Sequence, residues 1–87
     1  MKYTINNSVK LTIIEGESVL LNVDDGKYYG VDEVGTEILN LLENNEHISN
    51  IVNKIARIYN VEETKVAIDV KKFITKLNQL KLVHVHE

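Results

Sequence analysis

The histidines are the first residues whose type could support chemistry. His84 and His86 are two residues apart, which places both imidazoles on one side of an extended segment. Imidazole is a common metal ligand, but two such groups make an incomplete site, and the chain has no cysteine that could complete it. We therefore interpret them as polar residues of the C-terminal segment, and we predict neither a bound metal nor another cofactor.

Candidate nucleophiles and phosphate-binding loops are also missing from the sequence. Ser8, Ser18 and Ser49 all lie outside any Gly-x-Ser-x-Gly motif, so none of them is positioned as a serine nucleophile for activation by a histidine. The four glycines match neither the dinucleotide-binding spacing nor the P-loop spacing. We predict that the protein is not an enzyme and has no catalytic residues.

Length and charge limit what the chain can be. It has 87 residues, of which 44% are apolar, enough for a single domain over residues 1–87 with little room for a deep pocket. No apolar run is long enough for a membrane span or a secretion signal, so we expect a cytoplasmic protein without membrane contact. Residues 1–46 carry nine acids and three lysines, whereas residues 47–87 carry four acids, six lysines and one arginine. The basic half leaves an anionic partner open, and two solvated surfaces of opposite sign would look the same.

Alternating apolar residues predict three strands in the first third of the chain. Apolar and polar residues alternate over 9–13, and again after a Glu-Gly-Glu break. The apolar members of this second run are Val19, Leu21 and Val23. Asp24-Asp25-Gly26 predicts a hairpin turn, and the aromatic run 27–31 predicts a short third strand.

Helical spacing of apolar residues predicts three helices in the remainder. Asp32 is a candidate N-cap of the first, the second ends near Asn60, and Glu62 and Glu63 open the third. The apolar positions expected to face the core are Val34, Ile38, Leu41 and Leu42, then Ile48, Ile51, Val52, Ile55, Ile58 and Tyr59, then Val66, Val70, Phe73, Leu77 and Leu80. This order predicts an α+β fold, a three-stranded antiparallel sheet followed by three helices, similar to a winged helix-turn-helix.

The third predicted strand is a candidate binding edge. The last strand of a meander can lie at the sheet edge with unpaired N–H and C=O groups, and an extended peptide can add to such an edge. Ile68 and Ile74 give the third helix more apolar surface than one stripe needs, which favours a peptide groove beside the edge. Alternatively, Tyr28 or Tyr29 packs onto the sheet and Ile68 is simply exposed. The same free edge could also pair two copies into a dimer.

A winged-helix DNA-binding regulator is the second class of function, and a purely structural subunit is the third. The third helix segment has five lysines against three acids, and the second helix carries Asn50, Asn53, Lys54 and Arg57. DNA affinity depends on neutralising phosphates, which a chain of net charge −3 does poorly. We therefore predict a peptide partner and not nucleic acid.

Two motifs carry a family resemblance. The run Gly26-Lys27-Tyr28-Tyr29-Gly30-Val31-Asp32-Glu33-Val34-Gly35, followed by Ile38-x-x-Leu41-Leu42, resembles the PqqD-like domains known as RiPP recognition elements. So does Val66-x-x-Asp69-Val70-x-x-Phe73-Ile74-x-x-Leu77, closing on Leu82-Val83. The resemblance covers roughly residues 9–85. It implies a non-catalytic peptide chaperone that binds the leader of a ribosomally synthesised precursor peptide and presents it to a maturation enzyme.

The chain most resembles the small leader-binding proteins of lasso-peptide biosynthesis, whose partner is a separate leader protease of the cysteine-protease type. The resemblance implies that the leader adds to the third strand and lies against the third helix. The implied peptide-binding residues are Lys27, Tyr28, Tyr29, Gly30 and Val31 on the strand, Val66, Asp69, Val70, Phe73 and Leu77 on the helix, and Ile74 and Lys76 at its margin. Asp69 could pair with a basic or hydroxyl group of the leader, or be a capping or solvated acid.

Three positions depart from the family pattern, and none of them belongs to the implied groove. Asp32 stands where many relatives have asparagine, and Leu39 where a tryptophan is frequent. His47 stands where a serine or threonine cap is usual, which leaves the start of the second helix open.

Overall fold

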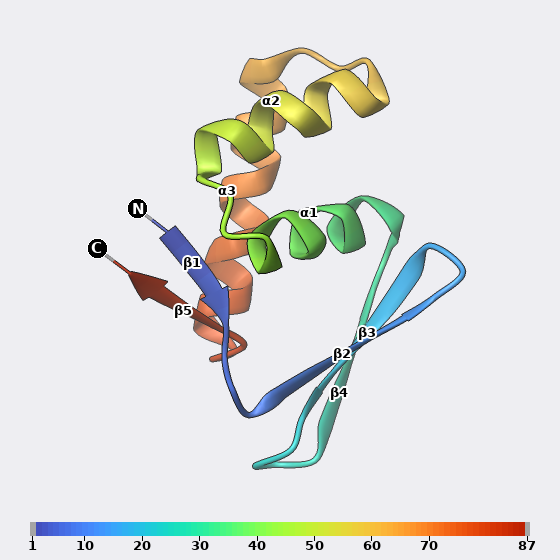
Figure 1. The fold of residues 1–87 in the computed structure, drawn as a ribbon, viewed down its shortest axis with the longest axis vertical. Helices are drawn as coiled ribbons and strands as arrows, with labels where there is room; N and C mark the ends of the chain where they lie inside the picture. Colours follow the sequence, from blue (N-terminus) through green and yellow to red (C-terminus); the bar gives the residue numbers. More distant parts are fainter. Residues whose placement is uncertain (1, 87) are drawn as a thin grey trace.

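A computed structural model describes residues 2–86 of the chain (Figure 1). The element order is β1 (Lys2–Ile5), β2 (Val9–Ile14), β3 (Glu17–Asn22), β4 (Lys27–Val31), α1 (Glu33–Glu43), α2 (Ile48–Tyr59), α3 (Glu63–Gln79) and β5 (Val83–His86). Strands β2, β3 and β4 form an antiparallel sheet in that order, and β1 pairs with β5 in a second, two-stranded sheet. The predicted α+β fold, a three-stranded antiparallel sheet followed by three helices, is confirmed.

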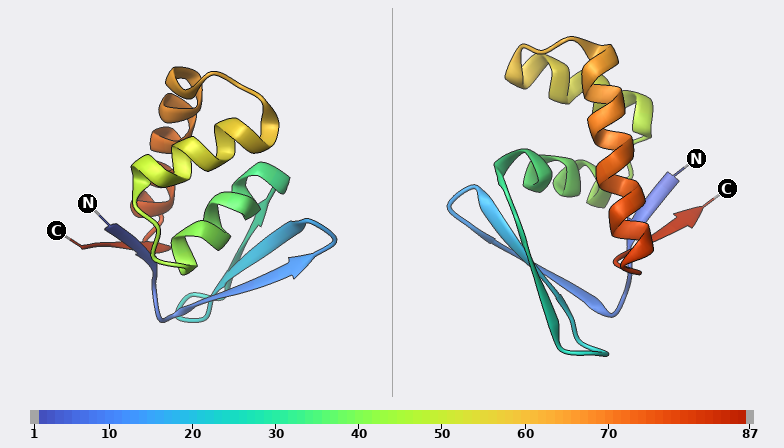
Figure 2. Two further views of the ribbon diagram at one scale, coloured as in Figure 1. Left: turned by 45° about the horizontal axis from the view of Figure 1, so that its top comes forward. Right: turned by 180° about the vertical axis from the view of Figure 1, so that it is seen from behind.

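The terminal sheet is the element that the sequence did not predict. Strand β1 pairs antiparallel with β5, so that Tyr3 lies opposite Val85 and Ile5 opposite Val83. The two ends of the chain consequently lie side by side (Figures 1 and 2). Because β1 precedes the predicted meander, the strand predicted as the third is β4.

The predicted buried face of β3 is wrong. Ser18 and Leu20 are 3% and 1% exposed, while Val19 and Leu21 are only half-buried and Val23 is exposed. Register explains the difference, since Leu20 lies opposite Leu11 on β2 and Tyr29 on β4, both of which pack against the core. All three helices lie on the side of the sheet that Leu20 faces (Figures 1 and 2).

Most of the predicted helix stripes are confirmed, but Val34 at the start of α1 is 39% exposed. Ile58, predicted to face the core, is 57% exposed near the end of α2. Ile74, predicted as surplus apolar surface of α3, is 3% exposed and belongs to the core. Ile68, six residues earlier on the same helix, is exposed. Leu39, which replaces the frequent tryptophan, is fully buried at the centre of α1.

The helix ends follow ordinary capping rules. Asp32 caps α1 as predicted, because its Oδ1 accepts a hydrogen bond of 2.8 Å from the Gly35 N–H. His47 occupies the N-cap position of α2 without a side-chain hydrogen bond, so this helix begins at Ile48 with a weaker cap. Asn60 ends α2 in the left-handed conformation, with φ of 53°, which asparagine tolerates better than most residues. No helix among residues 2–86 is long and apolar enough to cross a membrane.

A buried pair of hydroxyls ties the sheet to the start of α1. Ser18 Oγ and Thr36 Oγ1 are 2.8 Å apart, and both residues are 3% exposed. Thr36 Oγ1 also donates to the Asp32 carbonyl at 2.7 Å, so the Ser18 hydroxyl must be the donor within the pair. The chain of two bonds fixes the turn between β4 and α1.

We expect the two single substitutions at this hydroxyl pair to lower the stability of the protein by unequal amounts. Thr36→Val leaves the buried Ser18 hydroxyl without an acceptor and is expected to lower the free energy of unfolding by about 1–3 kcal/mol. Ser18→Ala leaves Thr36 bonded to Asp32 and is expected to lower it by only about 0.5–1.5 kcal/mol. Chemical denaturation of both variants tests this order, and a Ser18→Ala variant less stable than Thr36→Val would contradict it. The double variant should lose less than the sum of the two single losses, because the two hydroxyls share one hydrogen bond.

Candidate functional site

The outer edge of β4 is free, and the register tells which of its backbone groups point outward. The Val23 N–H donates to the Ser8 carbonyl at 2.9 Å, which makes these opposite residues a hydrogen-bonded pair that extends the β2–β3 ladder. Hydrogen-bonded and non-bonded pairs alternate along an antiparallel ladder. The β3 residues that bond to β2 are therefore Glu17, Val19 and Leu21, and those that bond to β4 are Ser18, Leu20 and Asn22.

It follows that Tyr28 and Gly30 present the free backbone groups of β4. Tyr29 lies opposite Leu20 and hydrogen-bonds to β3 through its backbone N–H and C=O. The backbone N–H and C=O groups of Tyr28 and Gly30 point away from β3. Within residues 2–86 no strand pairs with this side of β4. An incoming strand would find two donors and two acceptors there.

The two tyrosines of β4 face opposite sides of the sheet. Tyr29 lies on the helix side and packs against the core, while Tyr28 is 70% exposed on the outer face. Of the alternatives that the sequence left open, packing onto the core therefore holds for Tyr29 and not for Tyr28.

A groove runs beside the free edge, between β4 and α3. Its lower part, called here the lower groove, has a volume of about 340 Å³. The β4 side is formed by Tyr28, Tyr29, Gly30 and Val31, and the α3 side by Phe73, Lys76, Leu77 and Leu80. A cavity of this size with mostly apolar walls suits one or two side chains of a peptide whose backbone bonds to the edge.

A second cavity continues the groove past Phe73. This upper groove has a volume of about 530 Å³ and lies between the beginning of α1, the end of α2 and the first half of α3. Val34, Ile38 and Tyr59 form one wall, and Val66, Val70 and Phe73 form the other. Lys65 and Asp69 lie at its α3 rim and Asp32 at its α1 rim, so its opening is polar while its floor is apolar.

Phe73 separates the two cavities and lines both of them. It is half-buried and packs against the core. Gly35 makes room for it, because a Cβ built on Gly35 would lie 3.1 Å from Phe73 Cζ and 2.5 Å from Val31 Cγ1. The first turn of α1 can therefore approach β4 and α3 closely only with glycine at this position.

Gly35→Ala is expected to destabilise the protein although alanine is the better helix former. The new methyl overlaps Val31 Cγ1, which belongs to a branched side chain with few alternative rotamers. Overpacking of this kind typically costs about 1–3 kcal/mol, against about 1 kcal/mol of helix propensity gained. Chemical denaturation measures the net change, and a variant more stable than the wild type would contradict the close packing at Gly35.

Most of the predicted site residues meet in these two cavities. The β4 residues other than Lys27, together with Phe73, Lys76 and Leu77, line the lower groove, and Val66, Asp69 and Val70 line the upper groove. Lys27 lies at the far end of β4 opposite Asn22 and lines neither cavity. Ile74 faces the opposite side of α3, where it lines a cavity with Tyr3 and Val52.

Sequence reasoning missed the residues that α1 and α2 bring to the upper groove. Val34 and Tyr59 were assigned to the core stripes, yet Val34 is 39% exposed and Tyr59 half-buried. Burial raises the pKa of Tyr59, and the nearby carboxylates of Glu33 and Glu37 raise it further by disfavouring the phenolate. The Tyr59 hydroxyl is therefore a neutral hydrogen-bonding group at the groove at any physiological pH.

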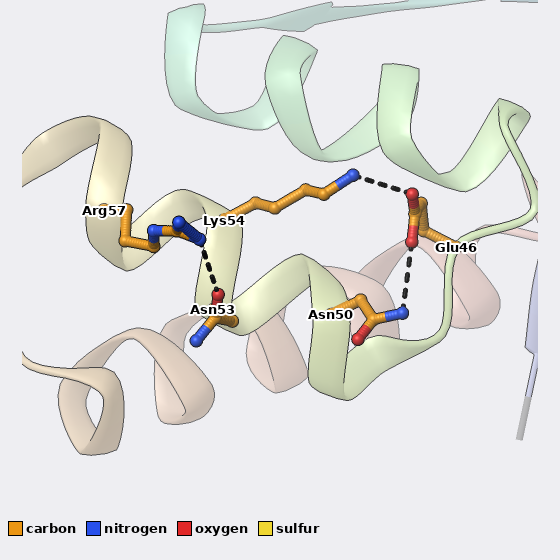
Figure 3. Close-up of polar contacts among 5 residues, drawn as sticks. All are labelled: Glu46, Asn50, Asn53, Lys54 and Arg57. Atoms are coloured by element: carbon orange, nitrogen blue, oxygen red, sulfur yellow. Dashed lines mark hydrogen bonds and ion pairs between the residues drawn. The ribbon is translucent and has the colours of Figure 1, made fainter.

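The polar residues of α2 that could have contacted DNA are engaged with one another and with acids (Figure 3). Lys54 Nζ lies 2.7 Å from Glu46 Oε1, and Asn50 donates to the other oxygen of the same carboxylate at 3.2 Å. These two hydrogen bonds hold the pKa of Glu46 below its usual value. Asn53 donates to Glu63 at 2.9 Å and accepts from Arg57 at 3.5 Å.

The two C-terminal histidines lie on one side of β5, as their spacing predicts. Their ring centroids are 4.9 Å apart in an edge-to-face arrangement, and His86 Nε2 lies 2.7 Å from Thr4 Oγ1 on β1. Within the described part of the chain no three metal-ligating side chains come together. The pair lies away from the groove, on the terminal sheet.

Comparisons with known proteins agree with this geometry. The sequence model of a family described as Coenzyme PQQ synthesis protein D (PqqD) matches residues 17–83, which include β3, β4 and all three helices. A search of curated protein sequences finds no significant match.

Two solved structures share the fold over nearly the whole length of both chains. The first, "TbiB1 in Complex with the TbiA(beta) Leader Peptide", is 32% identical, covers 97% of this chain and 98% of its own, and has a TM-score of 0.91. The second, "Lasso peptide synthetase B1 complexed with the leader peptide", is 16% identical, covers 98% and 100%, and has a TM-score of 0.90. On the family match and the 32% identity, the chain belongs to the PqqD family.

Proposed function

We propose that this protein binds the leader segment of a ribosomally synthesised precursor peptide, by strand addition to β4, and has no catalytic activity of its own. The observation that carries the proposal is the free edge of β4 directly beside an apolar groove. Backbone hydrogen bonds to Tyr28 and Gly30 would supply affinity, and the groove would supply specificity for side chains. The 32% identical TbiB1, whose structure contains a leader peptide, supports the same kind of ligand.

An added strand presents alternate side chains to the two faces of the sheet. Those on the helix side would enter the lower groove against Phe73 and Leu77, and the part of the peptide beyond Val31 would reach the upper groove. Those on the outer face would lie beside Tyr28 and remain accessible. A peptide held in this way keeps one face free for a second protein.

We further propose that the second protein is a separate leader protease of the cysteine-protease type. The small size of the domain favours an adaptor, because the groove is formed by one strand edge and one helix wall and offers no catalytic group. Leader removal by the purified protease should then be faster in the presence of the adaptor than with the protease alone. A cleavage rate that does not depend on the adaptor would contradict the proposed presentation of the leader to the protease, but not the proposed binding of the leader.

The experiment that tests leader binding is a titration with the precursor peptide encoded beside the gene, followed through the amide resonances of the protein. Binding by strand addition is expected to shift the amides of Tyr28 and Gly30 strongly, and those of the other sheet edge, on β2, weakly. Saturable binding that leaves the β4 amides unchanged would contradict the proposed site.

DNA binding is the alternative function, and the same sample distinguishes it. Three of the four α2 side chains that could contact DNA are hydrogen-bonded to Glu46 or Glu63, and the fourth, Arg57, donates to Asn53, so freeing them requires breaking these contacts. Phosphate neutralisation would give an affinity that falls steeply with salt, whereas strand addition should give a shallow dependence. A steep salt slope with duplex DNA and no binding of the leader would replace the proposal.

A further inference from the structure

The side of the groove formed by α3 carries a row of lysines. Lys65, Lys72 and Lys76 are spaced at i, i+7 and i+11, so they share one stripe of the helix. Lys65 lines the upper groove and Lys76 the lower groove, which places this stripe, called here the basic rim, along the groove. Asp69 interrupts the stripe near its upper end.

No lysine of the basic rim forms an ion pair with another side chain among residues 2–86. In the part of the chain that the structure describes, the single ion pair joins Lys54 to Glu46. Lys76 lies in the last turn of α3, where it interacts favourably with the helix dipole, but Lys72 lies a turn earlier and gains little from this effect. Positive charge concentrated beside a binding groove attracts negative charge in the ligand.

The basic rim continues onto a shallow surface of α3 with an apolar centre. Ile68, at 56% exposure, lies there between Lys71, Lys72 and Thr75. Lys76 borders this surface and the lower groove alike, so the two are continuous. A peptide in the groove can therefore reach the lysines without any change in the fold.

We propose that the basic rim selects leader peptides with acidic side chains beside the lower groove. The inference rests on the proposed strand addition and specifies the class of peptide that binds. The upper groove has the opposite preference, because Asp32 and Asp69 at its rim outnumber the single lysine there, Lys65. Glu33 and Glu37 lie close to Tyr59 and add further negative charge. Acidic residues of the ligand belong next to Lys72 and Lys76 and not at the upper end.

The direction of the added strand determines on which side of the apolar anchor the acidic residues lie in the peptide sequence. Every strand pair of the three-stranded sheet is antiparallel, and β4 runs toward the upper groove, opposite to α3 (Figure 2, right). An antiparallel peptide therefore passes Val31 and Phe73 first and leaves beside Lys27 and Lys76. Its acidic residues should follow, in sequence, the apolar residue that packs against Phe73.

A selection from a random peptide library tests the inference without knowledge of the natural ligand. Peptides selected by the wild-type protein are expected to contain acidic residues on the C-terminal side of an apolar anchor. Their consensus peptide is then titrated against Lys72→Glu/Lys76→Glu and against a control, Lys2→Glu/Lys10→Glu, which changes the net charge equally on other elements. The rim variant should lose about tenfold in affinity and the control less than about twofold.

The outcomes separate this inference from the function on which it rests. Peptides that shift the Tyr28 and Gly30 amides but lack acidic residues, or that lose affinity equally in both variants, overturn the acidic preference and leave strand addition standing. A library that yields no peptide bound at β4 overturns both. Unchanged peptide affinity in the rim variant, combined with slower leader removal by the protease, would assign the lysines to the protease interface and also overturn the inference.

Discussion

Gly30→Pro is expected to weaken leader binding by about a hundredfold while the protein stays folded. Proline removes the Gly30 N–H, which points away from the sheet, and its ring occupies the space of the incoming strand. One lost backbone bond together with an unsatisfied carbonyl on the peptide corresponds to about 2–4 kcal/mol. The β3–β4 ladder keeps its bonds, because these use Tyr29 and not Gly30. Titration with the leader peptide and thermal unfolding measure the two quantities.

Three matched variants make this result specific. Gly30→Ala retains the N–H, and its methyl meets no atom within 4 Å, so affinity should stay near that of the wild type. Ile13→Pro removes an outward N–H from β2 at the opposite edge of the sheet and should leave binding intact. Tyr29→Pro breaks a bond to Leu20 and should destabilise the fold itself. Equal losses in Gly30→Pro and Ile13→Pro would show that β4 is not the acceptor edge.

The importance of Gly30 could not be predicted from the sequence, because the run Lys27–Val31 does not say which amides point outward. Tyr28, Tyr29 and Gly30 are equivalent candidates until the β2–β3 ladder fixes the alternation. The same ambiguity explains the error on β3. Both Leu20 and Leu21 can fill a core, and only the pairing of Leu20 with Leu11 and Tyr29 decides between them.

Elements made by neighbouring residues were predictable, and contacts between distant residues were not. Asp32 caps α1 and Asn60 ends α2 through local hydrogen bonding and backbone conformation, which the residue types reveal directly. Strand β1 has four residues and pairs with β5 at the other end of the chain, so no local sequence pattern predicts this strand. The extended conformation around His84 and His86 was predictable from their spacing, but the strand that pairs with it was not.

The candidate site likewise has one part that was predictable from local sequence patterns and one part that depends on contacts between distant residues. The wall formed by Val66, Val70, Phe73 and Leu77 was predictable, since a single helical stripe defines it. The upper groove requires α1 and α2 to place Val34 and Tyr59 opposite this stripe, which is a property of helix packing. Helical spacing alone assigned both residues to the core, where neither is fully buried.

Phe73→Ala is expected to weaken leader binding by about 1.5–3 kcal/mol, the free energy of burying one large apolar side chain. Phe73 is the residue that both cavities share, so its ring is the surface against which an apolar anchor of the peptide packs. It also packs close to Gly35, where a built Cβ would lie 3.1 Å from Phe73 Cζ. The measurement is a titration with the leader peptide, in which the loss corresponds to about ten- to hundredfold in Kd.

Truncation of Phe73 also removes contacts with the core, so binding and folding must be measured separately. Ile58→Ala is the matched control for a lost apolar side chain, because Ile58 is 57% exposed on α2 and lines neither part of the groove. Phe73→Leu keeps an apolar side chain at the junction and should recover part of the affinity. An apolar peptide residue that packs against the Phe73 ring must lose affinity when this ring is removed. If a folded Phe73→Ala variant binds the leader as tightly as Ile58→Ala does, the apolar anchor of the peptide therefore lies elsewhere along β4.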